Sequence, residues 1–159
     1  MRFTRESEYG LHALVFLARQ PYDKVLPLSE IARSSGLPAN FLAKIFQKFA
    51  HHGVVRSFRG ARRGYCLARE PGAIRIRELL EAIEGPGVFE QCIFCRGRCD
   101  SDDPCPLHHG WSRVNADLVR FLEATTLEDL ARRRAARRRA DARTATGRRR
   151  PASQMAPRK

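Results

Sequence analysis

The sequence predicts a mainly α-helical fold that contains one small β-hairpin and ends in a long helix with an apolar seam. Two patterns support this class. Apolar residues recur with a helical period through most of the first 130 residues, and a short stretch near residue 60 looks like two paired strands around an arginine-rich turn. The chain has 159 residues, of which 43% are hydrophobic, which suits one domain with appendages.

Three helices are predicted in the first part of the chain. The first covers about residues 6–19, where apolar side chains recur three and four positions apart. A second helix covers residues 28–35 and stops at Gly36. The third begins near Pro38, which suits a first helical position, and Gly53 ends it.

A hairpin is predicted directly after the third helix, with strands at residues 54–58 and 65–68. The second and third helices, joined through residues 34–37, are typical of a helix-turn-helix. A hairpin directly after such a motif makes the domain a winged helix. With a further helix predicted at residues 76–84, the sequence indicates a winged helix-turn-helix domain over residues 1–84.

This arrangement suggests DNA as the partner. A winged helix presents its third helix to the major groove and its hairpin, the β-wing, to the minor groove. We expect the start of the third helix to face base edges, two lysines to reach phosphates and the turn to supply arginines. The residues concerned are Pro38, Ala39, Asn40, Lys44, Lys48, Arg59, Gly60, Arg62 and Arg63. For any single arginine, a solvated basic turn is the competing interpretation.

Charge is distributed unevenly along the chain. Lysine and arginine total 30 against 17 acidic residues, a formal net charge of +13, which favours a polyanionic partner over a small metabolite. Residues 131–159 contain twelve of the basic residues and a single acidic one. We expect this arginine-rich tail to be disordered and to add salt-dependent DNA affinity, although a compositional bias toward arginine would also produce it.

The sequence argues against several other classes of protein. Its longest apolar stretch, residues 9–18, is far short of the roughly 20 residues of a membrane-spanning helix. Charged residues near the N-terminus occupy the positions where a signal peptide has its apolar region. No phosphate-binding loop, paired catalytic carboxylates or nucleophile–histidine–aspartate set is present. We therefore expect a cytoplasmic protein that is not an enzyme and has no membrane partner or small-molecule substrate.

A cluster of cysteines lies in residues 85–106, which show no helical or strand period. The cluster consists of Cys92, Cys95, Cys99 and Cys105, and His108 follows it. Thiolates are soft ligands that suit iron–sulfur clusters, zinc and copper. In a reducing compartment they indicate a metal or redox centre rather than disulfides, with structural zinc or redox-active thiols as the alternatives.

The helix after the cysteines carries a heptad-like apolar seam. Its members step by three, four and three positions, and they are Trp111, Val114, Leu118 and Phe121. Such a seam suits a helix that packs on a partner helix. Residues 107–130 are therefore predicted to hold a dimerisation helix and a short C-terminal helix.

Taken in order, these features resemble one family of bacterial regulators. The resemblance is carried by Met1-Arg2-Phe3-Thr4, Tyr9, residues 28–32 and 41–46, Arg59-Gly60, Gly64-Tyr65 and the cysteine segment. Over about residues 1–130 they are similar to the Rrf2 family, in the group of IscR, NsrR and RirA. The resemblance implies a homodimeric winged-helix transcription factor that binds double-stranded operator DNA on the nucleoid.

The resemblance also implies a [2Fe-2S] or [4Fe-4S] cluster that senses iron, redox state, nitric oxide or iron–sulfur supply. It gives Cys92, Cys99 and Cys105 as the first ligands, although Cys92 lies one residue further from Cys99 than the family spacing. The fourth ligand is Cys95, His108 or a residue of the partner subunit. The expected switch is that an intact cluster orders residues 85–106 and that its loss shifts the two winged helices.

Other functions stay open. A regulator of the same fold without a cluster would use the cysteines for zinc or thiol redox chemistry. A second alternative acts by contact with a protein such as an enzyme of cysteine metabolism. An electron carrier is disfavoured because the winged helix would then have no role.

Overall fold

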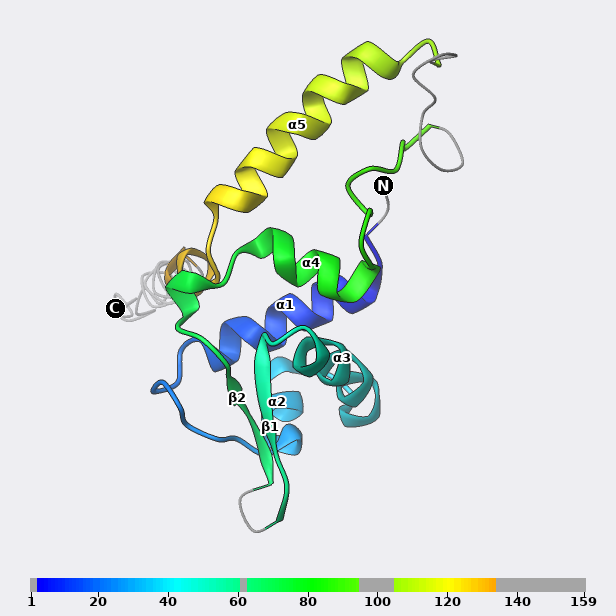
Figure 1. The fold of residues 1–159 in the computed structure, drawn as a ribbon. Coiled ribbons are helices and arrows are strands. Elements are labelled where there is room, and N and C mark those ends of the chain that lie inside the picture. Colours follow the sequence, from blue (N-terminus) through cyan, green and yellow to red (C-terminus); the bar gives the residue numbers. More distant parts are fainter. Residues whose placement is uncertain (1–2, 61–62, 95–104, 134–159) are drawn as a thin grey trace, which may run out of the picture.

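The computed structural model describes residues 3–60, 63–94 and 105–133. Its elements follow the order helix, helix, helix, hairpin and two further helices (Figure 1), so the predicted class of a mainly α fold with a small β-wing is confirmed. The helices are α1 (Arg5–Leu17), α2 (Leu28–Ser35), α3 (Ala39–His51), α4 (Ile76–Glu84) and α5 (His108–Ala124). A single hydrophobic core joins the first four, and its fully buried side chains include Leu14, Ile31, Leu42, Ile45, Phe46, Phe49 and Leu79.

The turn between α2 and α3 is fixed by local backbone chemistry. Gly36 has a φ of +69°, which L side chains rarely adopt, and the following Leu37 N–H donates to the Ala32 carbonyl at 2.9 Å. Pro38 has an extended backbone and is the cap before α3, while its carbonyl accepts the N–H of Leu42 at 3.1 Å. The third helix therefore begins at Ala39, next to Pro38, as the sequence predicts, with Pro38 as its cap.

The hairpin pairs β1 (Val55–Phe58) with β2 (Gly64–Leu67) in an antiparallel arrangement. The strand β2 lies one residue earlier in the chain than predicted. Leu26, from the loop before α2, adds a bridge on the far side of β2 by exchanging two 2.9 Å backbone hydrogen bonds with Tyr65. Gly64 makes this approach possible, because a Cβ atom there would lie 2.6 Å from the carbonyl carbon of Leu26. The loop thus holds the base of the hairpin against the helices.

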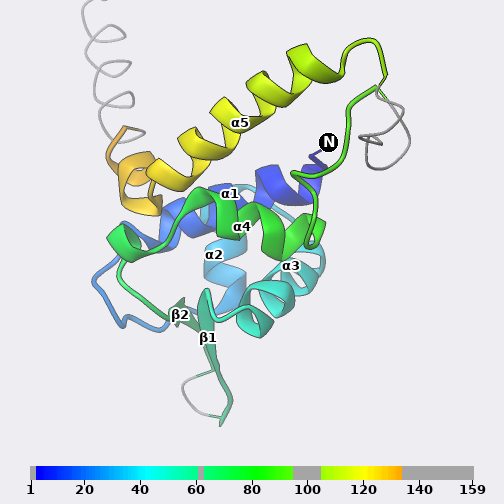
Figure 2. The same ribbon diagram turned by 45° about the horizontal axis from the view of Figure 1, so that its top comes forward.

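After the hairpin, a short 3-10 helix, η2 (Pro71–Ala73), leads into α4. The chain then continues to α5, which extends away from the helical body (Figures 1 and 2). Only Leu122, near its end, is buried within α5. Arg77 of α4 forms an ion pair with Glu123 at the same end. The first turns of α5 therefore lie apart from the core.

Residues 127–133 form a final helical segment. Thr126 and Asp129 cap it reciprocally: the Asp129 carboxylate accepts the Thr126 N–H at 3.0 Å and hydroxyl at 2.7 Å, which lowers the pKa of Asp129. Ala131 is buried, and its carbonyl accepts the guanidinium of Arg19 at 3.0 Å. Residues 131–133, at the start of the predicted tail, are therefore helical, and residues 134–159 lie outside the described part.

Within the described ranges, no helix combines the length and the apolar character that crossing a bilayer requires.

Candidate DNA interface and cysteine site

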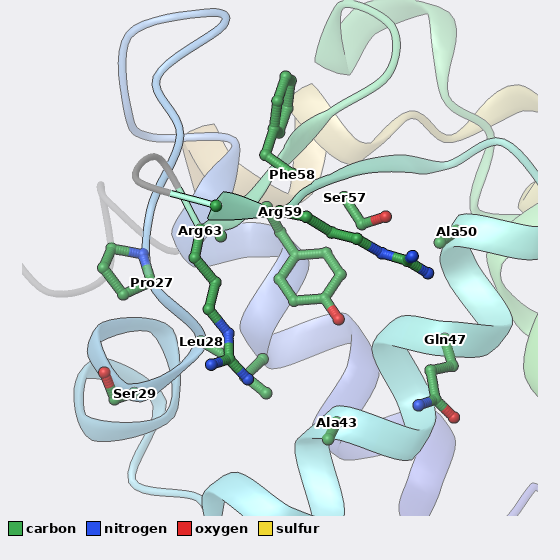
Figure 3. A pocket seen from close by; sticks show the side chains of 13 residues that line it. Pro27, Leu28, Ser29, Ala43, Gln47, Ala50, Ser57, Phe58, Arg59 and Arg63 are labelled. Carbon is green, nitrogen blue, oxygen red and sulfur yellow. The ribbon is translucent and has the colours of Figure 1, made fainter.

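A groove of about 1000 Å³ runs between α3 and the hairpin (Figure 3). The wall formed by α3 consists of Ala43, Gln47 and Ala50, which share one helix face, and the start of α2 contributes Leu28 and Ser29. The two alanines have short side chains, so they leave the groove open along the helix.

The opposite wall of the groove is basic. Arg59 and Arg63 extend from the hairpin into the groove, Arg59 toward α3 and Arg63 toward Leu28 (Figure 3). Among the described residues that line the groove, none is acidic. The groove can therefore attract an anionic ligand, and a DNA backbone is one such anion.

The start of α3 is accessible, as a helix that reads bases requires. Pro38, Ala39, Asn40 and Lys44 are all exposed. Next to them lies a second open hollow of about 420 Å³, where the rings of Tyr9 and Phe41 meet edge to face at 5.6 Å. These residues stay predictions for base and phosphate contact.

The turn of the hairpin depends on a glycine. Gly60 is exposed with a φ of +78°, and its carbonyl accepts the N–H of Arg63 at 3.1 Å. Arg59, Gly60 and Arg63 therefore stand at the tip of the wing, where the prediction put them, whereas Arg62 lies outside the described residues.

Lys48 requires a correction. Its Nζ atom donates to Glu6 at 2.6 Å and to the carbonyl of Ile83 at 3.1 Å, so it faces α1 and α4 rather than the groove. We remove Lys48 from the set of DNA-contacting residues, because its amine is already engaged within the fold.

Gln47 is a groove residue that the sequence did not single out. It is exposed, lines the groove and lies opposite Arg59 (Figure 3). The available signal was its spacing of four positions from Ala43, which places both residues on the same helix face.

The outer side of the wing is tied to the loop after α1. Arg56 of β1 forms an ion pair with Asp23, and its guanidinium lies 5.9 Å from the ring centre of Phe58. The pKa of Arg56 is raised, chiefly by a hydrogen bond with Cys66 and further by the charge of Asp23. Cys66 itself is buried in β2, as a small apolar residue would be.

The cysteine segment is described only at its two ends. Cys92 is buried, and its Sγ accepts the N–H of Phe94 at 3.4 Å, while Cys105 is half-buried just before α5. Cys95 and Cys99 lie outside the described residues. In the part of the chain that the structure describes, three or more metal-ligating side chains do not come together.

His108 has a side chain suited to a ligand. Its Nδ1 atom is buried without a hydrogen-bond partner among the described residues, and its backbone N–H donates to the Cys105 carbonyl at 2.9 Å. A buried unsatisfied nitrogen is costly, and a metal ion is one way to satisfy it. The chemistry of a histidine nitrogen and the two thiols of Cys92 and Cys105 suits an iron–sulfur cluster and also zinc, and the described residues do not bring the three side chains together.

The predicted dimer seam on α5 divides into two parts. Val114 and Phe121 are 59% and 55% exposed, which leaves them available to a partner. Leu118 packs partly against the core, and Trp111 meets the ring of Phe94 edge to face at 6.4 Å.

Known proteins share this organisation. A family model described as "Rrf2: Iron-dependent Transcriptional regulator" matches residues 3–133. A putative HTH-type transcriptional regulator of Aquifex aeolicus (strain VF5) is 34% identical over 132 residues, which cover 82% of this chain and 91% of that protein.

Two solved structures extend the similarity to the fold. CymR (YrzC), the global cysteine regulator of B. subtilis, is 28% identical with a TM-score of 0.69, over 82% of this chain and 96% of that one. IscR of T. potens is 25% identical with a TM-score of 0.66, over 99% of this chain and 93% of that one. These relatives are regulators rather than enzymes, and because the family model spans the winged helix, the cysteine segment and α5, the chain belongs to the Rrf2 family of transcriptional regulators.

Proposed function

We propose that this regulator is a homodimer that binds double-stranded operator DNA and senses iron, redox state, nitric oxide or iron–sulfur supply through a cysteine-ligated iron–sulfur cluster. The observation that carries the DNA part is the groove beside α3, into which Arg59 and Arg63 point without an acidic neighbour in its described lining.

In the proposed complex α3 enters the major groove, and one sugar–phosphate strand runs between α3 and the hairpin. Arg59 and Arg63, with Gly60 and Arg62 in the same turn, meet that strand and the adjacent minor groove. Pro38, Ala39, Asn40 and Lys44 face bases and the second strand. In a dimer formed through Trp111, Val114, Leu118 and Phe121, two copies of α3 reach half-sites about one DNA turn apart.

Selection from a random duplex library with the full chain, followed by footprinting, tests the DNA assignment. We expect an enriched palindrome with two protected half-sites and an affinity at least about 1,000-fold above that for unrelated DNA. A library that enriches no sequence would contradict the assignment.

For the cluster we propose Cys92, Cys99 and Cys105 as ligands, with Cys95 or His108 as the fourth. When bound, the cluster supplies a centre that reacts with oxygen or nitric oxide and depends on iron. This chain contributes the connection: coordination by Cys92 and Cys105 joins the segment after α4 to the start of α5. The unsatisfied Nδ1 atom makes His108 one of the two candidates for the fourth position.

The cluster is tested by purification without oxygen, with visible spectroscopy and assays for iron and acid-labile sulfide. We expect a coloured protein that contains both. His108→Ala and Cys95→Ala then form a matched pair, because the true fourth ligand is the one whose loss lowers iron and sulfide content. A colourless wild-type protein would contradict the cluster.

A second candidate is a cluster-free regulator with zinc or redox-active thiols at the same cysteines, or one that acts by contact with an enzyme of cysteine metabolism. The structural similarity to CymR, a global cysteine regulator, supports this second candidate. Zinc without sulfide in the anaerobic protein supports the first form. Co-purification of such an enzyme without a specific DNA footprint supports the second.

A further inference from the structure

Lys48 lies where α3 meets two other helices. Its Nζ atom donates to Oε2 of Glu6 in α1 at 2.6 Å and to the carbonyl of Ile83 in α4 at 3.1 Å. The helices touch closely here, because a Cβ atom on Gly10 would lie 2.6 Å from Ile83 Cδ1 and 2.9 Å from Phe49 Cζ. Lys48 therefore links α3 to α1 and to the end of α4 by directional bonds across a tightly packed junction.

Glu84, the last residue of α4, holds the first turn of α1 at the same junction. Its Oε1 atom accepts the Thr4 N–H at 2.7 Å, the Thr4 hydroxyl at 2.9 Å and the Ser7 hydroxyl at 2.5 Å. Ser7 is buried, so this bond satisfies a hydroxyl that would otherwise be costly. Two consecutive residues, Ile83 and Glu84, thus fix the positions of both α1 and α3.

The chain that leaves this junction runs directly to the cysteine segment. Gly85 and Gly87 have φ values of +97° and +84°, so they make a turn suited to glycine. Phe89 is then buried, and its carbonyl accepts Nδ2 of Asn115 in α5 at 2.8 Å. Cys92 follows, also buried. A short anchored segment therefore connects a thiol of the cluster site to the end of α4.

We propose that Lys48 is a positioning residue that couples the state of the cysteine segment to the pose of α3 through the end of α4. This inference rests on the proposed function. When coordination at Cys92 holds or releases the segment, the Ile83 carbonyl shifts relative to α1. Lys48 passes that shift to α3, whose adjacent face carries Gln47 into the groove. Such coupling is reciprocal, so DNA bound to α3 alters the accessibility of Cys92.

A coupling role differs measurably from a stabilising one. The side chains of Lys48 and Glu6 are 41% and 30% exposed, and ion pairs of that exposure add little to folding stability. Lys48→Met keeps the aliphatic stem and removes both bonds. We expect its melting temperature to stay within about 4 °C of wild type, whereas its coupling is lost.

The first test uses full-length, reduced, cluster-free protein and the selected operator duplex. Alkylation of Cys92 by N-ethylmaleimide is followed by peptide mass spectrometry, with remaining thiols labelled by an isotopic form after denaturation. In wild type, saturating operator changes the Cys92 rate about fivefold or more. In Lys48→Met the saturated complex shows less than a twofold change, and Lys48→Arg restores the effect. An operator effect that Lys48→Met retains in full overturns the proposal.

The second test compares operator Kd values of loaded and cluster-free protein. We expect Lys48→Met to keep its iron and sulfide but to reduce the ratio of the two Kd values about tenfold. Lys44→Met, one helical turn away, is the control, because it weakens both forms and leaves the ratio intact. If the wild-type protein binds no cluster or does not bind the operator, the proposed function itself is contradicted. If Lys48→Met shows the same ratio of Kd values between loaded and cluster-free protein as wild type, the coupling role of Lys48 is overturned while the proposed function stands.

Discussion

Two alanines and two arginines decide what the groove beside α3 can hold. Ala43 and Ala50 contribute almost no volume, whereas Arg59 and Arg63 contribute long, permanently charged side chains from the opposite wall. A planar guanidinium matches a phosphate in both charge and geometry. The residues of the groove therefore favour a sugar–phosphate strand over an apolar or cationic ligand.

Replacing Arg63 by alanine tests this assignment. We expect operator affinity to fall about tenfold, because one charge-assisted hydrogen bond is lost, and the slope of log K against log salt to become shallower by about 1. Titration at several salt concentrations measures both. Arg120→Ala is the control, since Arg120 pairs with Asp117 on α5, away from the groove. Equal effects of the two variants would contradict the proposed interface.

At the scale of elements, the hairpin keeps its place because a third segment pairs with it. Leu26 bridges β2 through Tyr65, and Gly64 leaves room for the Leu26 carbonyl. The wing is therefore held by backbone hydrogen bonds on two sides, and its position relative to α3 depends on one glycine.

Gly64→Ala is expected to disrupt this element. The added methyl group meets backbone atoms of Leu26 that cannot rotate away, which costs about 2 kcal/mol of folding free energy. Chemical denaturation measures the loss, and DNA affinity should fall with it. Gly110→Ala is the matched control, because nothing lies within 4 Å of its Cβ position and a helical alanine is favourable. Unchanged stability of Gly64→Ala would refute the packing argument.

The long helix has a face whose partner we expect to be a second copy of the chain. Val114→Asp combined with Phe121→Asp puts charges on two exposed apolar positions, so the protein should sediment as a monomer while keeping its helical content. Ala116→Asp, exposed on the opposite face of α5, should leave the assembly intact. A double variant that sediments like wild type would rule out this face as the dimer contact.

At the scale of the whole molecule, charge is segregated. The winged helix carries a local basic groove in a nearly balanced body, whereas residues 131–159 carry most of the net charge of +13. Local charge on a shaped surface supports specific recognition, whereas charge on a tail supports attraction to any DNA. The two regions should therefore be separable by experiment.

Deleting residues 134–159 provides that separation. We expect affinity for unrelated DNA to fall more than affinity for the operator, and the salt dependence of both to become shallower. Binding titrations with the two duplexes at matched salt measure the change. An unaltered melting temperature shows that the shortened chain still folds. A loss confined to operator binding would show instead that the tail belongs to the specific site.

The amino-acid sequence by itself determined the elements of this protein and their order. Residues 28–35 and 76–84 are helical as predicted, because their apolar period and the glycines that end them are local signals. The hairpin and its basic turn were also readable, with strand limits shifted by one residue. Local backbone preferences and short-range periodicity carry this information, and neither depends on the rest of the chain.

Only the tertiary structure decided which side chains meet. Lys48 looks like a phosphate ligand in the sequence, yet it bonds to groups 42 and 35 residues away. Gln47 and Arg59 share a groove because α3 and the hairpin pack at one particular angle, and burial of the His108 Nδ1 atom depends on how the chain folds around it. The sequence contains every one of these residues, but their pairing is set by packing between distant elements, which no local pattern records.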